Sequence, residues 1–118
     1  MLDIKKRTKI FSIEIIKLVA QFSWKNPILV VLGKQLLRSA TSVSANLVEG
    51  SGSVSDKEFI NFLAIARKSS LETQHWLDLI VESKTLPEKI IQPFQKEAIE
   101  IGKILTTSLK NNKKKTLK

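Results

Sequence analysis

The sequence of 118 residues contains no cysteine, no tyrosine and a single histidine. Without cysteine the chain can form neither disulfides nor thiolate metal sites, and it has no thiol nucleophile. No uninterrupted apolar run exceeds five residues, whereas a membrane-spanning helix needs about 20. Ser12, Glu14 and Lys17 also interrupt the stretch that a signal peptide would keep apolar. We therefore expect one cytoplasmic domain with no membrane segment.

Acidic residues are scarce, and the positive excess lies at the two chain ends. The chain has 20 lysines and arginines against 11 acidic residues, a net charge of +9. Residues 1–9 hold four basic residues and one acidic residue, residues 110–118 hold five basic residues, and the long middle part is nearly neutral. Basic ends of this kind are candidate contacts for the phosphates of RNA or DNA. The candidate nucleic-acid-binding residues are Lys5, Lys6, Arg7, Lys9, Lys110, Lys113, Lys114, Lys115 and Lys118.

Strand signals are few, because the sequence has no Asn-Gly or Asp-Gly turn and little period-two alternation. Apolar residues instead recur at spacings of three and four in four segments, the pattern of amphipathic helices. The fold class is therefore predicted to be all-α. The expected helices cover about 4–24, 27–49, 56–84 and 87–111, which makes residues 1–111 a four-helix bundle and residues 112–118 a basic disordered tail.

Cap signals mark the starts of these segments. Asp3 is available to cap the first helix. Asn26 precedes Pro27 as an N-cap does when proline occupies the first helical position. Ser55 and Glu58 have the spacing of a capping box. Three helix starts are thus predicted from local chemistry alone.

The other boundaries depend on glycine, on a second capping pair and on proline. The glycines after Glu49 suit a left-handed residue at a helix C-terminus. Thr85 and Glu88 repeat the capping-box spacing before the last segment. Pro93 lies inside that segment, where it removes one backbone hydrogen bond, so we expect a kink or a restart there.

Short connections join the four segments, and short connections make neighbouring helices antiparallel. The predicted arrangement is therefore an up-down-up-down bundle. In such a bundle the start of the first helix and the end of the fourth lie at the same end. We expect the two basic chain ends to meet there and form one binding surface.

Catalytic and metal-binding patterns are weak. Glu72 and His75 have the Glu-x-x-His spacing of di-iron bundles, but such sites need a second histidine, so an ordinary interface or partly buried histidine is favoured. Gly50–Ser53 resembles a phosphate loop only superficially, since it follows a helix and lacks the Gly-Lys-Ser/Thr signature. We predict no enzymatic activity, no cofactor and no metal site.

Several polar or aromatic residues flank the apolar faces of the second and third segments. Arg38, Asn46 and Glu49 lie beside the apolar stripe of the second segment. Glu72 and Trp76 belong to the third. One interpretation is a set of interhelical hydrogen bonds and ion pairs that fixes the register of the helices. The other is a polar recognition patch. The first interpretation is favoured.

Apolar residues exceed what one buried stripe per helix requires. A helix that is apolar on more than one side is buried on more than one side. In a bundle of this size the second face is most naturally a subunit interface, so a homo-oligomer is predicted. The surplus residues are Ile10, Ile13, Ile16, Val19, Val30, Val31, Leu37, Val48, Ile60, Ile65, Leu71 and Leu79.

Four stretches of the chain resemble the bacterial four helix bundle protein family, which includes proteins encoded by intervening sequences in large-subunit ribosomal RNA genes. The matching stretches are residues 35–49 (QLLRSATSVSANLVE), 55–60 (SDKEFI), 72–79 (ETQHWLDL) and 100–105 (EIGKIL). The resemblance covers about residues 10–110. Pro93 and the glycines after Glu49 depart from the family pattern.

That family is similar in fold to the accessory variability determinant of diversity-generating retroelements, a basic pentamer that binds a reverse transcriptase and nucleic acid. The resemblance implies a ring-like homo-oligomer, a pentamer, with an RNA-associated or adaptor role and no catalysis. The expected function is a non-enzymatic, RNA-associated bundle protein that binds through its basic chain ends. The alternative is a protein–protein adaptor, such as a reverse-transcriptase or ribosome-associated accessory, without direct contact to nucleic acid.

Overall fold

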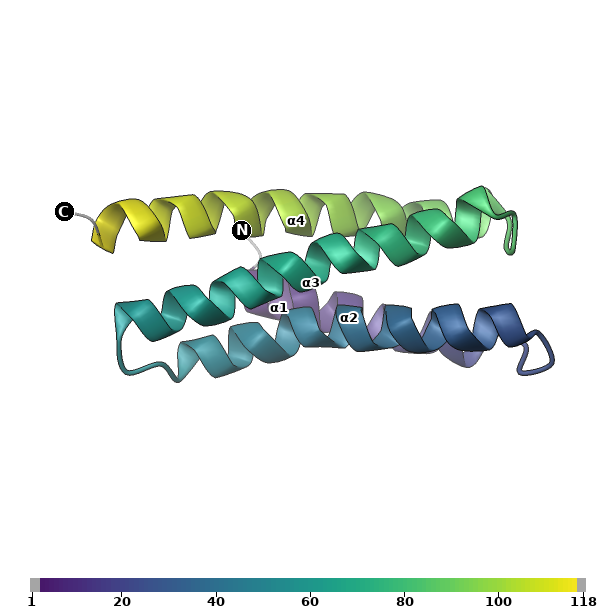
Figure 1. The fold of residues 1–118 in the computed structure, drawn as a ribbon, viewed down its shortest axis with the longest axis horizontal. Coiled ribbons are helices and arrows are strands. Elements are labelled where there is room, and N and C mark those ends of the chain that lie inside the picture. Colours follow the sequence, from purple (N-terminus) through teal and green to yellow (C-terminus); the bar gives the residue numbers. More distant parts are fainter. Residues whose placement is uncertain (1–2, 117–118) are drawn as a thin grey trace.

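The computed structural model of the protein describes residues 3–116. These residues form four helices and no strand. The helices are α1 (Ile4–Ala20), α2 (Pro27–Ser51), α3 (Asp56–Glu82) and α4 (Glu88–Thr116). They lie along the long axis of an elongated molecule with Cα extents of 53 × 23 × 20 Å (Figure 1). The all-α prediction is confirmed.

Helices that follow one another in sequence pack side by side. α2 contacts α1 and α3, and α3 also contacts α4, whereas α1 and α4 touch over a small area. Contacts between neighbours pair residues in reversed order along the two helices. Between α3 and α4 the pairs are Asp78 with Gln95, Gln74 with Ala98 and Arg67 with Thr106.

The core is a continuous apolar cluster to which every helix contributes. Ile15, Leu36, Leu77, Ile91 and Leu105 are completely buried within it. The stripe predicted on the second segment is buried along its length, as its spacing of three and four requires. Its members are Leu29, Gly33, Leu36, Ala40, Val43 and Leu47.

The predicted caps at the first three helix starts are confirmed. The side chains of Asp3 and Asn26 accept hydrogen bonds from backbone N–H groups in the first turn of α1 and α2. Ser55 Oγ accepts a bond of 3.1 Å from the backbone N–H of Glu58. The fourth start differs, because the Thr85 hydroxyl bonds with a neighbouring serine hydroxyl and α4 begins only at Glu88.

Three helix ends differ from the predicted ones. α1 ends at Ala20, although the apolar pattern continues to Phe22, whose ring packs against the core from the following turn. α2 continues to Ser51 and its C-cap, Gly52, has a φ of −94°, so the predicted left-handed glycine is wrong. A left-handed residue follows α3 instead, which ends at Glu82: Lys84 has a φ of 58°.

α4 runs as one helix through Pro93, so the predicted restart is absent. Pro93 lies on the exposed side near the start of the helix. The carbonyl that loses its helical donor there can bond water instead.

The prediction of a disordered tail over 112–118 is also wrong for residues 112–116, because the helix continues to Thr116, and residues 117–118 lie outside the described residues. Lys113–Lys115 lie in its last turn, where positive charge interacts favourably with the helix dipole.

Candidate nucleic-acid interface

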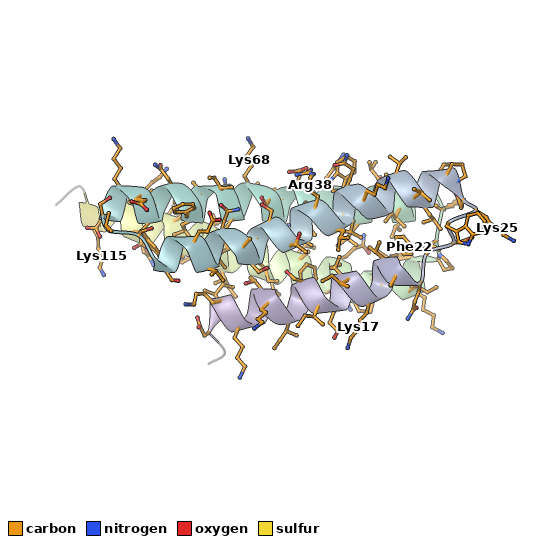
Figure 2. The ribbon with its side chains drawn as sticks, turned by 90° about the horizontal axis from the view of Figure 1, so that it is seen from below. Lys17, Phe22, Lys25, Arg38, Lys68 and Lys115 are labelled. Carbon is orange, nitrogen blue, oxygen red and sulfur yellow. The ribbon has the colours of Figure 1, made fainter. Side chains whose placement is uncertain are left out.

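The C-terminal lysines lie on a regular helix rather than on a disordered segment. Lys110, Lys113, Lys114 and Lys115 occupy the last two turns of α4 and are exposed. The yellow C-terminal end of α4 extends well past the start of α1 (Figure 1). Figure 2 shows Lys115 at one end of the molecule and Lys25 at the other. The remaining predicted contact, Lys118, lies outside the described residues.

The N-terminal basic residues lie elsewhere, at the start of α1, where Arg7 contacts the middle of α4. Arg7 forms a two-pronged ion pair with Glu97, in which Nε lies 2.8 Å from Oε2 and Nη2 lies 2.7 Å from Oε1. Lys110 is 13 residues farther along α4, about 20 Å at 1.5 Å per residue. The two basic ends therefore do not form one cluster. The register set by the Arg7–Glu97 pair leaves the end of the longer helix, α4, beyond the start of α1.

Arg7 is a structural ion-pair partner in this arrangement. Its side chain and that of Glu97 are about two-thirds buried. The hydrogen bonds that Arg7 donates to Glu97 raise the pKa of Arg7, an effect that outweighs the opposing desolvation. Because its guanidinium is already neutralised, Arg7 is removed from the set of candidate phosphate contacts.

The Arg7–Glu97 pair is expected to hold α1 against α4, where few other contacts exist. A double-mutant cycle with Arg7→Met and Glu97→Gln should give a coupling free energy of about 1 kcal/mol. This value lies between that of a fully buried charge-assisted hydrogen bond, which contributes more, and that of a fully exposed ion pair, which contributes less. Urea unfolding of the four proteins measures it. Amide exchange should rise mainly in α1 of both single variants. A coupling energy near zero would contradict the role assigned to the pair.

Lys5, Lys6 and Lys9 remain exposed and line an open groove between the start of α1 and the end of α2. The groove has a volume of about 760 Å³. Its other lining residues are Asp3, Ser44, Ala45, Val48 and Glu49. Glu49, predicted as an interface residue, thus lies among lysines of the first helix. Two carboxylates in the lining reduce the attraction of this groove for anions.

The interhelical interpretation holds for Arg38 and Glu72, which form an ion pair between α2 and α3. Arg38 lies near the middle of the molecule in Figure 2. Asn46 donates to the backbone carbonyl of Ser42, 2.8 Å away, within its own helix. The Ser42 hydroxyl in turn bonds with the Ser69 hydroxyl of α3. The Arg38–Glu72 and Ser42–Ser69 pairs thus connect α2 and α3, whereas Asn46 bonds within α2.

Trp76 packs against the core, and its ring centroid lies 5.1 Å from that of His75. Its indole N–H has no hydrogen-bond partner within the part of the chain that the structure describes. His75 is exposed. Among residues 3–116, no group of three or more histidine, aspartate or glutamate side chains could hold a metal ion. The same part of the chain contains no helix long and apolar enough to cross a membrane.

Sequence reasoning missed three further exposed lysines on α4, Lys89, Lys96 and Lys103. They lie outside residues 1–9 and 110–118, the two basic chain ends that were predicted as contacts. A signal was nevertheless present, because each is seven residues from the next and the series continues to Lys110. A spacing of seven residues returns to nearly the same side of a helix.

Comparison with known proteins identifies the family. A crystal structure of a protein of unknown function from the S23 ribosomal protein family of Bacteroides thetaiotaomicron VPI-5482 has 31% sequence identity and a TM-score of 0.84. The similarity covers 92% of this chain and 99% of that one. The curated proteins contain no match. The family described as 23S rRNA-intervening sequence protein matches residues 1–107. The chain therefore belongs to the 23S rRNA-intervening sequence protein family.

Proposed function

We propose that the protein is a non-enzymatic, homo-oligomeric bundle that associates with RNA through exposed lysines near its chain ends. The observation that carries the proposal is the C-terminal end of α4, where Lys110 and Lys113–Lys115 are exposed on an ordered helix. The family name refers to 23S rRNA, and the solved relative belongs to a ribosomal protein family. Both names fit an RNA-associated role.

The proposed bundle is up-down-up-down, supported by the reversed order of contacts between neighbouring helices. The proposed assembly is a homo-oligomer. Its support is the apolar outer face of α1, where Ile10, Ile13 and Ile16 are 41–47% exposed. A pentameric ring rests on the resemblance to the retroelement accessory protein alone. The absence of cysteine fits action in a reducing cytoplasm.

The proposed contact is electrostatic. Lysine is a flexible point charge that neutralises phosphates without reading bases. Residues 110–115 contain no aromatic side chain on which a base could stack. Binding should therefore depend little on sequence and steeply on salt. In a ring, the same lysines would be presented once by every subunit.

Substituting lysines is the test of this proposal. Lys110→Gln, Lys114→Gln and Lys115→Gln together should weaken binding to a structured RNA by about 10- to 100-fold and lower the salt slope by about two to three, close to one per phosphate contact. Titrations at two or more salt concentrations measure both. Truncation is unsuitable, because residues 1–9 include the buried Thr8 and the ion-paired Arg7.

The matched control removes the same charge from other surfaces. Lys34→Gln, Lys57→Gln and Lys68→Gln change exposed lysines of α2 and α3. This triple variant should bind within about threefold of the unmodified protein. Equal affinity of the C-terminal variant and the unmodified protein, or a flat salt dependence, would contradict the proposed contact.

The alternative function, a protein–protein adaptor without nucleic-acid contact, has its own supporting observation. Trp24 is 80% exposed in the α1–α2 turn, beside Lys25, whose Nζ lies 5.8 Å from the indole centroid. Exposed tryptophan is typical of binding hot spots on proteins. Trp24→Ala would abolish partner binding by such an adaptor. The same substitution should leave RNA binding through α4 unchanged.

A further inference from the structure

Four lysines form a straight line along α4. Lys89, Lys96, Lys103 and Lys110 recur every seven residues and are all exposed. Seven residues turn an α-helix to within about 20° of its starting direction and advance it by about 10.5 Å. Lys114 continues the line on the next turn. We call these five residues the α4 lysine stripe.

The α4 lysine stripe lies on the side of the helix that faces away from the core. Ile91, Ala98 and Leu105 each follow a stripe lysine by two residues and are at most 1% exposed. Two residues correspond to about 200° around a helix, so the stripe lies opposite the buried side. Rotation of α4 would bring lysines into the core. The packing of α4 therefore keeps the lysines on the solvent side, about 10 Å apart along the axis.

Negative charge next to the stripe is small. Of the three acidic residues of α4, Glu97 is occupied by Arg7 and Glu88 lies in the first turn. Glu100 lies beside the stripe, with its carboxylate 3.9 Å from Lys103 Nζ. Both of these side chains are more than half exposed, and such surface pairs contribute little. Lys103 can therefore exchange this partner for a phosphate.

A hollow of about 470 Å³, whose lining includes hydroxyl and amide side chains, borders the C-terminal half of the stripe. It lies beside a part of α4 beyond the start of α1, since Arg7 in the first turn of α1 already pairs with Glu97. Hydroxyl and amide groups of this kind contact phosphate and sugar oxygens in nucleic-acid complexes. The hollow is lined by Lys103, Ile104, Thr107, Ser108, Asn111 and Asn112.

We propose that the α4 lysine stripe and the adjoining hollow form a track for the phosphodiester backbone of RNA. This inference rests on the proposed function and extends it from the chain ends to the length of α4. The stripe runs over 26 residues, from Lys89 to Lys114, a rise of about 38 Å, which exceeds the reach of a terminal contact. The track contacts backbone rather than bases, so it accepts structured RNA regardless of sequence.

The test variant keeps the terminal lysines and removes the rest of the stripe. Lys89→Gln, Lys96→Gln and Lys103→Gln in the full chain should weaken binding to an RNA duplex of about 20 base pairs by about 10- to 100-fold, and lower the salt slope by about two to three. The Lys34, Lys57 and Lys68 control described above has the same net charge. It should bind within about threefold of the unmodified protein. Circular dichroism verifies that all variants remain helical.

The outcomes separate this inference from the proposed function. Loss of binding in the C-terminal variant together with unchanged binding in the stripe variant would overturn the track and leave the proposed function standing. No salt-dependent RNA binding by the unmodified protein would overturn both. Equal losses in the stripe variant and the control would also overturn the track, since net charge alone would explain them. Weaker binding of a DNA duplex of the same sequence would support contacts to the RNA sugar from the hollow.

Discussion

Replacing Leu36 by alanine is expected to lower the free energy of unfolding by about 2–5 kcal/mol. The Leu36 side chain is completely buried in α2, the helix that packs against both α1 and α3. Truncation therefore removes contacts at the centre of the bundle and leaves a cavity that two helices would have to move to fill. Urea denaturation followed by circular dichroism, at a fixed protein concentration, measures the loss.

Leu79 provides the matched control for Leu36. It is also a helical leucine, but 37% of its surface is exposed on α3. Leu79→Ala removes the same atoms and should lower the free energy of unfolding by no more than about 1 kcal/mol. Equal losses in the two variants would show that the core is not centred on Leu36.

The positions of buried residues were predictable because helical packing depends on a local period. The spacing of three and four on α2 predicted Leu36 and Val43 as core residues, and both are at most 2% exposed. Helix ends depend on tertiary contacts that no local pattern contains. Phe22 continues the apolar period of α1 yet lies beyond its end, because a ring can reach the core from a turn as well as from a helix.

For the candidate interface, the sequence predicted which residues are basic but not where they lie in space. The lysines at the chain ends could be listed, but their relative positions depend on the register between α1 and α4. That register is visible in the Arg7–Glu97 pair, which joins residues 90 positions apart. The prediction that the basic ends meet took the helices to be of comparable length, and the short α1 makes it wrong. The seven-residue spacing of the α4 lysines needs no register and could be found from sequence.

The surplus apolar residues divide into two groups once the helices are placed. Val19 and Leu37 pack against the core from its margin, so they need no partner subunit. Other members of the set remain more than 40% exposed: Ile10, Ile13 and Ile16 on α1, and Val31, Val48, Ile65 and Leu71 on α2 and α3. All of these residues were predicted to form a subunit interface, but the two groups have different explanations. Only the second group supports assembly.

Replacing Ile13 by glutamate is therefore expected to dissociate the proposed homo-oligomer. Ile13 is 41% exposed and lies two residues before the fully buried Ile15, on the opposite side of α1 from the core. The carboxylate remains hydrated in the monomer. In a dry subunit interface it would lose water without gaining a partner, at a cost of several kcal/mol, which lowers the association constant more than 100-fold. Light scattering measures the shift in mass.

Val54→Glu provides the control for charge alone, because Val54 is 91% exposed in the α2–α3 turn, far from the isoleucines of α1 in sequence. It should leave the mass unchanged. Helical circular dichroism of Ile13→Glu should match that of the unmodified protein, which distinguishes dissociation from unfolding. A monomeric unmodified protein, or an oligomer that tolerates glutamate at position 13, would show that the exposed isoleucines of α1 do not form the interface. The RNA titration at two salt concentrations would then report on a single copy of the α4 lysine stripe, with a correspondingly lower slope.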